Sequence, residues 1–195
     1  MAAAKNFKKG NNCQISEETN LENVTCGNDV VINEGVQLKN IIIGNGTKIS
    51  RNITLYSPNS EKPIIIGKDV WLSNGVYGEA TGGKITIDDY SVIAHFTTLL
   101  TSSGPGEKSK IMNEIYPVEC GDIHINKHCW IGAHSVVLPF VTLPEGTVIA
   151  SNSLARKQEY KSWSVYAGNP ALFKKSFDPK YIEELKKKHN FEIDE

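Results

Sequence analysis

Branched aliphatic residues recur every six positions in the stretch WIGAHSVVLPFVTLPEGTVIAS, which covers residues 130–151. The period matches neither the 3.6-residue repeat of an amphipathic helix nor simple alternation along one long strand. The register can be followed through most of the chain, at Ile43, Ile49, Leu55, Ile66, Leu72, Gly78, Ile87, Ile93, Leu99, Ile125, Ile131, Val137, Leu143, Ile149 and Ala155, after a less regular set at Ile15, Leu21, Cys26, Ile32 and Leu38.

A second class of position follows the first at a spacing of four. These residues are small or β-branched, at Thr47, Ile53, Val70, Val76, Ser91, Thr97, Cys129, Ser135, Val141, Thr147 and Ser153. The two classes together predict a short strand and then a tight corner, three times per coil, around a narrow triangular core. We therefore expect an all-β solenoid, a parallel β-helix of hexapeptides whose coils stack about 4.8 Å apart. A sandwich of short strands would need turns every eight to twelve residues and would not hold a six-residue phase.

Three insertions interrupt the register, between Leu55 and Ile66, between Gly78 and Ile87, and between Leu99 and Ile125. Each follows the third hexad of a coil, so all three loops should leave the solenoid at one corner. The longest loop, residues 102–122, is a candidate lid or an arm that clasps a neighbour. The sequence places a candidate site at this corner.

The hexad phase ends after Ala155, and a different segment follows. Asp178 and Pro179 form a helix start, with the aspartate as N-cap and the proline in the first turn. We expect a β-helix domain over residues 1–175 and a helical tail over 176–195. The helix is predicted to cover the open end of the solenoid.

Composition narrows the class of protein. A chain of 195 residues fits one domain, and a net charge of −1 with 22% charged residues argues against a nucleic-acid surface. No apolar run predicts a signal peptide or a membrane span, so we expect a cytoplasmic protein that acts on a small molecule. The four cysteines form no CxxC pair, so we expect neither a disulfide nor a structural zinc site.

Two motifs resemble a known family. The stretch HCWIGAHSVVLP, and AGNPA at residues 167–171 followed by LFKK, look like the left-handed β-helix acyltransferases of the hexapeptide-repeat family, over about residues 43–175. That resemblance implies a left-handed coil and a homotrimer with active sites between neighbouring prisms. It also implies acetyl-CoA as the donor, without a metal, and a sugar, amino sugar or small alcohol as the acceptor.

The resemblance also implies positions for the cofactor. Ala133 and Ser151 fall where the sugar acetyltransferases offer backbone atoms to the pantetheine arm. Arg156 and Lys157 match a pair that flanks the cofactor, and Lys174 matches the basic residue beyond the GNPA turn. Cations at the end of such a groove would meet the phosphates.

The catalytic histidine of the galactoside type is missing from its usual place. The resemblance puts it in a glycine-histidine-proline turn at the start of the long loop, where this chain has Ser103, Gly104 and Pro105. Transfer to a hydroxyl needs a base, and histidine suits that role near neutral pH. We predict His95, which follows a core residue by two positions and should stack between Asn74 and Ala133. Serine acetyltransferases resemble this arrangement, on a different coil.

The other histidines receive structural roles. His134 is interpreted as a turn residue, and His124, His128 and His189 are expected to be exposed. With His95 as the base, Ser73 and Asn74 would contact the acceptor. Glu79, or alternatively Asp88, would orient the imidazole near that acceptor, and a backbone N–H near Gly132 would stabilise the oxyanion.

The leading hypothesis is an acetyl-CoA-dependent acetyltransferase that modifies a hydroxyl of a sugar or nucleotide-linked sugar in surface polysaccharide biosynthesis. An N-acetyltransferase on an amino sugar is the first alternative, because an amine needs a strong base less. A zinc enzyme resembling the γ-carbonic anhydrases could use His95, His128 and His134. However, His128 and His134 should point apart. A non-catalytic scaffold is the last alternative.

Overall fold

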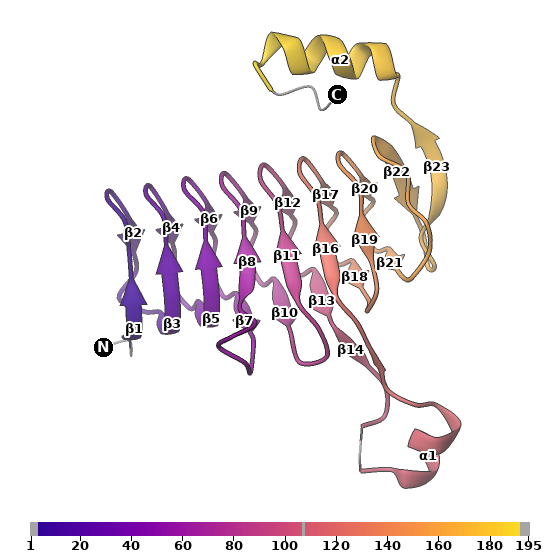
Figure 1. The fold of residues 1–195 in the computed structure, drawn as a ribbon, viewed down its shortest axis with the longest axis horizontal. Coiled ribbons are helices and arrows are strands. Elements are labelled where there is room, and N and C mark those ends of the chain that lie inside the picture. Colours follow the sequence, from indigo (N-terminus) through magenta and orange to yellow (C-terminus); the bar gives the residue numbers. More distant parts are fainter. Residues whose placement is uncertain (1–3, 107, 192–195) are drawn as a thin grey trace.

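A solenoid of short parallel strands makes up most of the computed structural model, which describes residues 4–106 and 108–191. Figure 1 shows the coils stacked in chain order, with an arm leaving on one side and a helix on the other. No helix within that part of the chain is long and apolar enough to cross a bilayer. The ends of the two predicted segments, residues 1–3 and 192–195, lie outside the described residues, as does position 107 of the long loop.

Successive coils pair through parallel ladders in two sheets. The nine-stranded sheet runs β2 (Gln14–Ile15), β4 (Val31–Ile32), β6 (Lys48–Ile49), β9 (Trp71–Leu72), β12 (Val92–Ile93), β17 (Trp130–Ile131), β20 (Val148–Ile149), β22 (Ser164–Ala167) and β23 (Leu172–Ser176). The twelve-stranded sheet covers the other two faces. One of these faces holds β7 (Thr54–Tyr56), β10 (Tyr77–Glu79), β13 (Thr98–Leu100), β18 (Val136–Val137) and β21 (Leu154–Ala155). The other holds β8 (Ile64–Ile66), β11 (Ile85–Ile87), β16 (Ile123–Ile125) and β19 (Thr142–Leu143). Long strands β3 (Asn20–Cys26) and β5 (Gln37–Ile43) join both faces, and β1 (Ala4–Lys8) pairs with β3.

Three corners run along the solenoid, and each keeps one name below. The helix corner comprises the turns 67–70, 88–91, 126–129 and 144–147. The His95 corner comprises the turns 73–76, 94–97, 132–135 and 150–153. The loop corner comprises 57–63, 80–84, 101–122 and 138–141.

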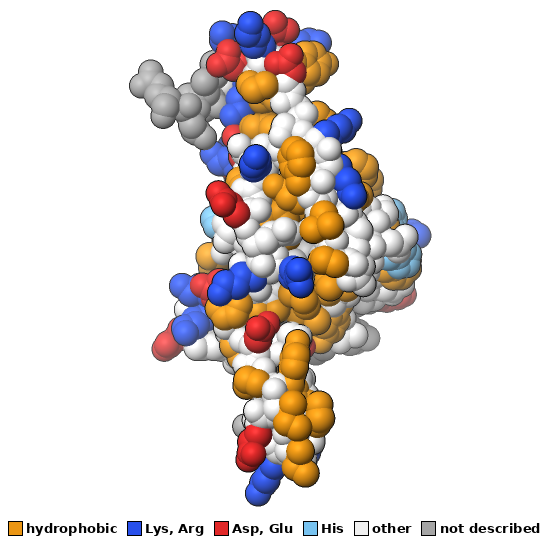
Figure 2. All heavy atoms as spheres, turned by 90° about the vertical axis from the view of Figure 1, so that its right-hand side faces the viewer, with side chains coloured by type: hydrophobic (Ala, Val, Ile, Leu, Met, Phe, Trp, Pro, Cys, Tyr) orange, Lys and Arg blue, Asp and Glu red, His pale blue; other side chains and the backbone are white. Residues whose placement is uncertain are grey.

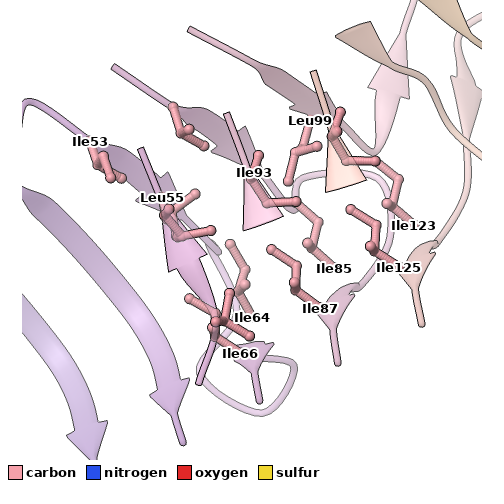
Figure 3. Close-up of a cluster of buried hydrophobic side chains, with 14 of the residues drawn as sticks. Ile53, Leu55, Ile64, Ile66, Ile85, Ile87, Ile93, Leu99, Ile123 and Ile125 are labelled. Carbon is pink, nitrogen blue, oxygen red and sulfur yellow. The ribbon is translucent and has the colours of Figure 1, made fainter. Parts of the chain in front are cut away.

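The predicted hexad residues form the core. Every position of the main aliphatic register is buried. Figure 3 shows part of this core, with side chains such as Leu55, Ile93 and Ile125 directed into the interior. Ile93, for example, is in register with Leu72 below and Ile131 above, and all three are fully buried. The small corner residues are buried as well. Thr97 Oγ1 donates to the Gly132 carbonyl at 3.3 Å, so this hydroxyl joins one coil to the next.

The three insertions do leave from one corner, as the register predicts. Strands β7, β10 and β13 pair with one another before the loops, and β8, β11 and β16 pair after them. The longest loop forms an arm, in which β14 (Ser102–Ser103) pairs with β15 (Glu119–Cys120) and α1 (Lys110–Ile115) lies at the tip. Figure 1 shows the arm projecting away from the coils.

Asparagines stabilise the same corner in the first coils. Asn6 donates to Asn23 at 2.9 Å, Asn23 to Asn40 at 2.8 Å, and Asn40 to the Ser57 carbonyl at 2.7 Å. All three asparagines have positive φ, a conformation that asparagine tolerates better than most residues. The ladder therefore combines the turn geometry with hydrogen bonds between coils.

The C-terminal helix exists but does not cover the open end. Helix α2 (Pro179–Lys188) begins at Asp178, whose side chain accepts from Lys180 N–H at 2.9 Å. It lies along the helix corner (Figure 1), where Lys186 pairs with Glu145 at 2.9 Å. The end of the solenoid is closed instead by the antiparallel β22–β23 pair and by three buried residues, Tyr160, Tyr166 and Ala171.

An aromatic column explains this position of the helix. Along the helix corner His128 stacks on Tyr90 at 5.0 Å and on Trp163 at 6.0 Å, and Phe191 packs edge-on to His128 at 4.7 Å. The prediction of an exposed His128 is wrong, because the residue is half-buried in this column. Burying these aromatic faces stabilises the returned C-terminal segment.

Acid should weaken this packing. Burial lowers the pKa of His128 below its ordinary value of 6.5, so the unfolded chain binds the proton more readily than the folded one. The stability that the neutral His128 contributes is therefore fully present above pH 6.5, and it is lost as the pH drops below that value. We expect the Tm to decrease between about pH 7.5 and about pH 5, and to decrease less in His128→Phe, which keeps an aromatic ring. Equal pH profiles of the two proteins in thermal unfolding would contradict this assignment.

The four cysteines are free thiols in this structure. Burial raises the pKa of Cys26 and of Cys129 to about 12. Both thiols therefore stay protonated and behave as small core residues.

Candidate functional site

The His95 corner stacks its four turns in the predicted order. The N–H of Phe96 donates to the Asn74 carbonyl at 3.0 Å, and that of His134 donates to the His95 carbonyl at 2.9 Å. One coil further, Asn152 N–H donates to Ala133 at 2.9 Å. Asn74, His95, Ala133 and Ser151, the second residues of their turns, thus form one column.

The GNPA turn continues this column. Leu154 N–H donates to the Gly168 carbonyl at 3.0 Å, and Gly168 N–H donates to Ser153 Oγ at 3.0 Å. Ala171 N–H returns to the Leu154 carbonyl at 2.8 Å. The motif that carries the family resemblance therefore lies directly beyond Ser151, on the corner that holds His95.

The His95 ring is exposed at the middle of the column. Its nitrogens have no hydrogen-bond partner among residues 4–106 and 108–191, so they can meet a ligand. The neighbouring Phe96 stacks on His134 at 5.1 Å, which gives His134 the structural role that the sequence predicts for it. Gly75 makes room for Phe96, because a Cβ there would lie 2.4 Å from the phenyl ring and its φ is +71°.

Backbone donors along the column are left open. At some turns a side chain of the next coil accepts the N–H of the second turn residue, as when Asn74 Oδ1 accepts from Arg51 at 3.1 Å or Asp89 from Lys68 at 2.8 Å. In the coils that follow Asn74, the side chains of the stacked residues His95, Ala133 and Ser151 do not accept the N–H of the coil before. The N–H groups of Asn74, His95 and Ala133 have no acceptor in the described part of the chain. The hexad pattern alone does not predict this row, although the absence of Asn or Asp at the stacked positions His95, Ala133 and Ser151 is a signal for it.

Such a row suits an extended ligand that carries amide carbonyls. Unpaired peptide N–H groups at a surface gain net hydrogen-bond energy from a ligand that displaces water. Pantetheine is a chain of that kind, so the residues present fit the group that the sequence resemblance implies. Gly132 is not one of the donors, because its N–H donates to Ile149 at 2.7 Å. The open N–H next to Gly132 is that of Ala133, so the donor predicted near Gly132 stays a prediction.

The structure separates the three residues that the sequence predicts near the acceptor substrate. Asn74 belongs to the open column, whereas Ser73 is buried, with 3% of its surface exposed. Glu79 lies at the far end of β10, where its carboxylate accepts from the Tyr77 hydroxyl at 3.0 Å and from Ser102 at 3.4 Å. The structure thus brings only Asn74 of these three into the column of His95.

Asp88 cannot orient the His95 imidazole from its position. Its carboxylate lies 2.9 Å from Nε2 of His124, at the start of the helix-corner turn 88–91. This contact also corrects the expectation that His124 is freely exposed. His128 and His134 occupy different corners, and no three metal-ligating side chains converge among the described residues.

The predicted phosphate cations are distributed over two faces. Arg156 and Lys157 follow β21 at the loop corner, where Lys157 Nζ lies 4.8 Å from the Phe140 ring centre. Lys174 is exposed in β23, on the nine-stranded sheet. Strand β13 separates His95 from the long arm, so the loop corner and the His95 corner are different edges of one face. Within one chain the cations do not converge on the column.

Curated relatives cover only part of the chain. No protein-family model matches it. A dTDP-4-amino-4,6-dideoxy-D-glucose acyltransferase of Escherichia coli is 35% identical over 102 residues, which is 49% of this chain and 53% of the relative. The chain thus spans about half the length of the curated relatives it matches.

Solved structures match over more of the length. AntD, an N-acyltransferase from Bacillus cereus solved with dTDP and coenzyme A, is 22% identical, with a TM-score of 0.67 over 95% of this chain and 91% of its own. A hexapeptide-repeat-containing acetyltransferase from Vibrio cholerae, solved with acetyl coenzyme A, is 23% identical, with a TM-score of 0.59 over 71% of this chain and 72% of its own. At these identities the structural likeness shows the fold alone. Together with the curated relatives it confirms the resemblance to hexapeptide-repeat acyltransferases that the motifs predict.

Proposed function

We propose that this protein is an acetyl-CoA-dependent acetyltransferase that modifies a sugar or a nucleotide-linked sugar. The observation that carries the proposal is the column in which an exposed His95 lies between unpaired backbone N–H groups and leads to the GNPA turn. The names of the curated and structural relatives support the same class of reaction. We expect a hydroxyl group as the acceptor. An amine is the second possibility, and it is supported by two relatives, one named as an amino-sugar acyltransferase and one as an N-acyltransferase.

The side chain and the backbone groups of the column have different roles in the proposed reaction. Acetyl-CoA, when bound, supplies an acetyl group activated as a thioester. His95 accepts the proton of the acceptor hydroxyl as the new ester bond forms, and it returns that proton to the departing sulfur. The N–H groups of His95 and Ala133 orient a carbonyl by donating to it, and that of Ala133 is the donor expected near Gly132. For an amine acceptor, His95 takes the proton during or after attack.

The proposal also covers the handedness of the coil, the oligomeric state and the cellular role of the protein. We propose a left-handed coil and a homotrimer, in which cations of one copy meet the column of another. The exposed apolar residues of the arm, Ile111, Met112, Ile115, Tyr116 and Val118, support a neighbour contact because such patches mark interfaces. Figure 2 shows hydrophobic side chains gathered along the arm at the bottom of the view. We also propose a cytoplasmic role in surface polysaccharide biosynthesis, with an acyltransferase domain over 1–175 and a tail over 176–195.

Coenzyme A binding tests the proposal directly. We expect calorimetric titration to give a stoichiometry near one per chain. We also expect Lys174→Ala to weaken binding by about three- to tenfold, because one exposed phosphate contact is lost. Lys175→Ala is the matched control, since Lys175 neighbours Lys174 on β23 and its Nζ lies 5.6 Å from the Phe177 ring centre. The control should bind coenzyme A like the wild type.

Two results would contradict these assignments. If the wild-type protein binds no coenzyme A, the acyltransferase proposal fails. If both lysine variants bind as tightly as the wild type, the phosphates do not contact Lys174 and the carried-over cofactor position is wrong.

A further inference from the structure

A hollow of about 270 Å³ lies on the face between the His95 corner and the loop corner, over the first coils of the solenoid. It spans β3, β5, β7 and β10, which are neighbours in Figure 1. Neither the proton transfer by His95 nor the open N–H row involves this hollow. Its lining is mixed, with two tyrosine rings beside amide, hydroxyl and charged groups.

Strand register explains why the face is hollow here. One outward row runs Gln37, Thr54, Tyr77 from coil to coil, and the next row runs Lys39, Tyr56, Glu79. Thr54 is the short side chain among longer neighbours, so the surface sinks above it. Tyr56 and Tyr77 stand on two sides with 36% and 40% of their surfaces exposed, which leaves ring area open to a ligand.

The polar groups of the hollow are held in place. Glu22 pairs with Lys39 at 3.1 Å, and the Tyr77 hydroxyl donates to Glu79 at 3.0 Å. Partial burial raises the pKa of Tyr77, and the hydrogen bond to Glu79 acts in the same direction, so the phenol keeps its proton. Among the side chains that line the hollow, Glu22 and Lys39 balance each other, and the Glu79 carboxylate beside the Tyr77 hydroxyl makes the rim negative. A diphosphate would be repelled here, whereas a neutral or cationic group would be accepted.

The hollow adjoins the catalytic column on its N-terminal side. Tyr77 begins β10 directly after the turn 73–76, the turn on which the His95 coil stacks. The open N–H of Ala133 and the GNPA turn lie on the other side of His95. A donor laid on that side and an acceptor seated in the hollow would therefore approach His95 from opposite sides.

We infer that this hollow binds the sugar ring of the acceptor, and that it prefers an amino sugar whose ammonium faces Glu79. Tyrosine faces and amide groups together form a surface that suits a saccharide ring, with one apolar side and a rim of hydroxyls. The inference rests on the proposed acyltransferase function and names the acceptor class. It places any diphosphate of a nucleotide-linked acceptor outside the hollow.

Filling the hollow tests the inference. Thr54→Trp should weaken the binding of glucosamine by about tenfold or more, measured by saturation-transfer NMR titration, while coenzyme A affinity stays within about twofold. Thr86→Trp is the matched control, because Thr86 is also a half-buried, outward threonine but lies on β11, on another face. Wild type should bind glucosamine more tightly than glucose, and glucose 1-phosphate most weakly. Glu79→Gln should remove the preference for glucosamine over glucose.

The outcomes separate this inference from the function it rests on. Unchanged glucosamine binding in Thr54→Trp, equal loss in Thr86→Trp, or tightest binding of glucose 1-phosphate would each overturn the sugar site. Coenzyme A binding by the wild type would still support the acyltransferase in those cases. Absence of coenzyme A binding would remove the function, whatever the sugar titrations show.

Discussion

Replacing His95 by alanine is expected to lower kcat for acetyl transfer to a hydroxyl acceptor by about 10²- to 10⁴-fold, the usual contribution of a general base. The ring is exposed, has no partner among the described residues, and stands between the hollow and the open N–H row. Because the variant keeps its backbone N–H, coenzyme A should bind within about threefold of the wild-type affinity. Steady-state kinetics and calorimetry on the same preparation measure both quantities.

A second histidine serves as the control. His189 is the exposed C-cap of α2, away from the column, so His189→Ala should leave kcat unchanged. With an amine acceptor, the loss in His95→Ala should be smaller, because an amine attacks without prior removal of its proton. Full activity of His95→Ala on both kinds of acceptor would show that the base is another residue.

Replacing Ile93 by alanine is expected to reduce the free energy of unfolding by about 2–5 kcal/mol, as for other buried Ile-to-Ala changes. The side chain is fully buried, and its partners Leu72 and Ile131 belong to the coils on either side. In a narrow prism those neighbours are held by their own ladders, so the cavity cannot close easily. The loss should appear as a lower midpoint in guanidinium denaturation.

Val92 provides the matched control for this core position. It precedes Ile93 on β12 but faces outward and is only half-buried. Val92→Ala should therefore cost less than about 1 kcal/mol. If both variants shift the midpoint equally, the inward and outward positions of the hexad are assigned wrongly.

The core and the column could be predicted because coil stacking converts sequence spacing into spatial neighbourhood. A residue such as Ile131 needs only its place in the hexad to be assigned to the interior, and it is fully buried. The same rule put His95 between Asn74 and Ala133. The carbonyls of Asn74 and His95 each accept an N–H from the next coil, as this stacking requires. The predicted common corner for the loops followed from the register in the same way.

Features that depend on contacts across faces could not be predicted. The return of α2 depends on Phe191 meeting Tyr90 and His128, residues that belong to separate coils and carry no periodic signal. The pairing of Asp88 with His124 likewise joins adjacent coils through side-chain reach. The hollow reflects one short side chain, Thr54, among longer neighbours, a difference in volume that hydrophobic periodicity does not report.

Ladder pairing between neighbouring coils also bears on how the chain assembles. Gln14 bonds to the strand of Val31, and even across the arm Ile93 bonds to the strand of Ile131, so most strand partners are close in sequence. An all-β protein of this kind has a low contact order for its class and needs little loop-closure entropy per step. During synthesis, each finished coil can template the next before the chain is complete. Tyr160 and Tyr166 emerge after the stacked coils, so growth would end with an aromatic plug that excludes water from the last coil.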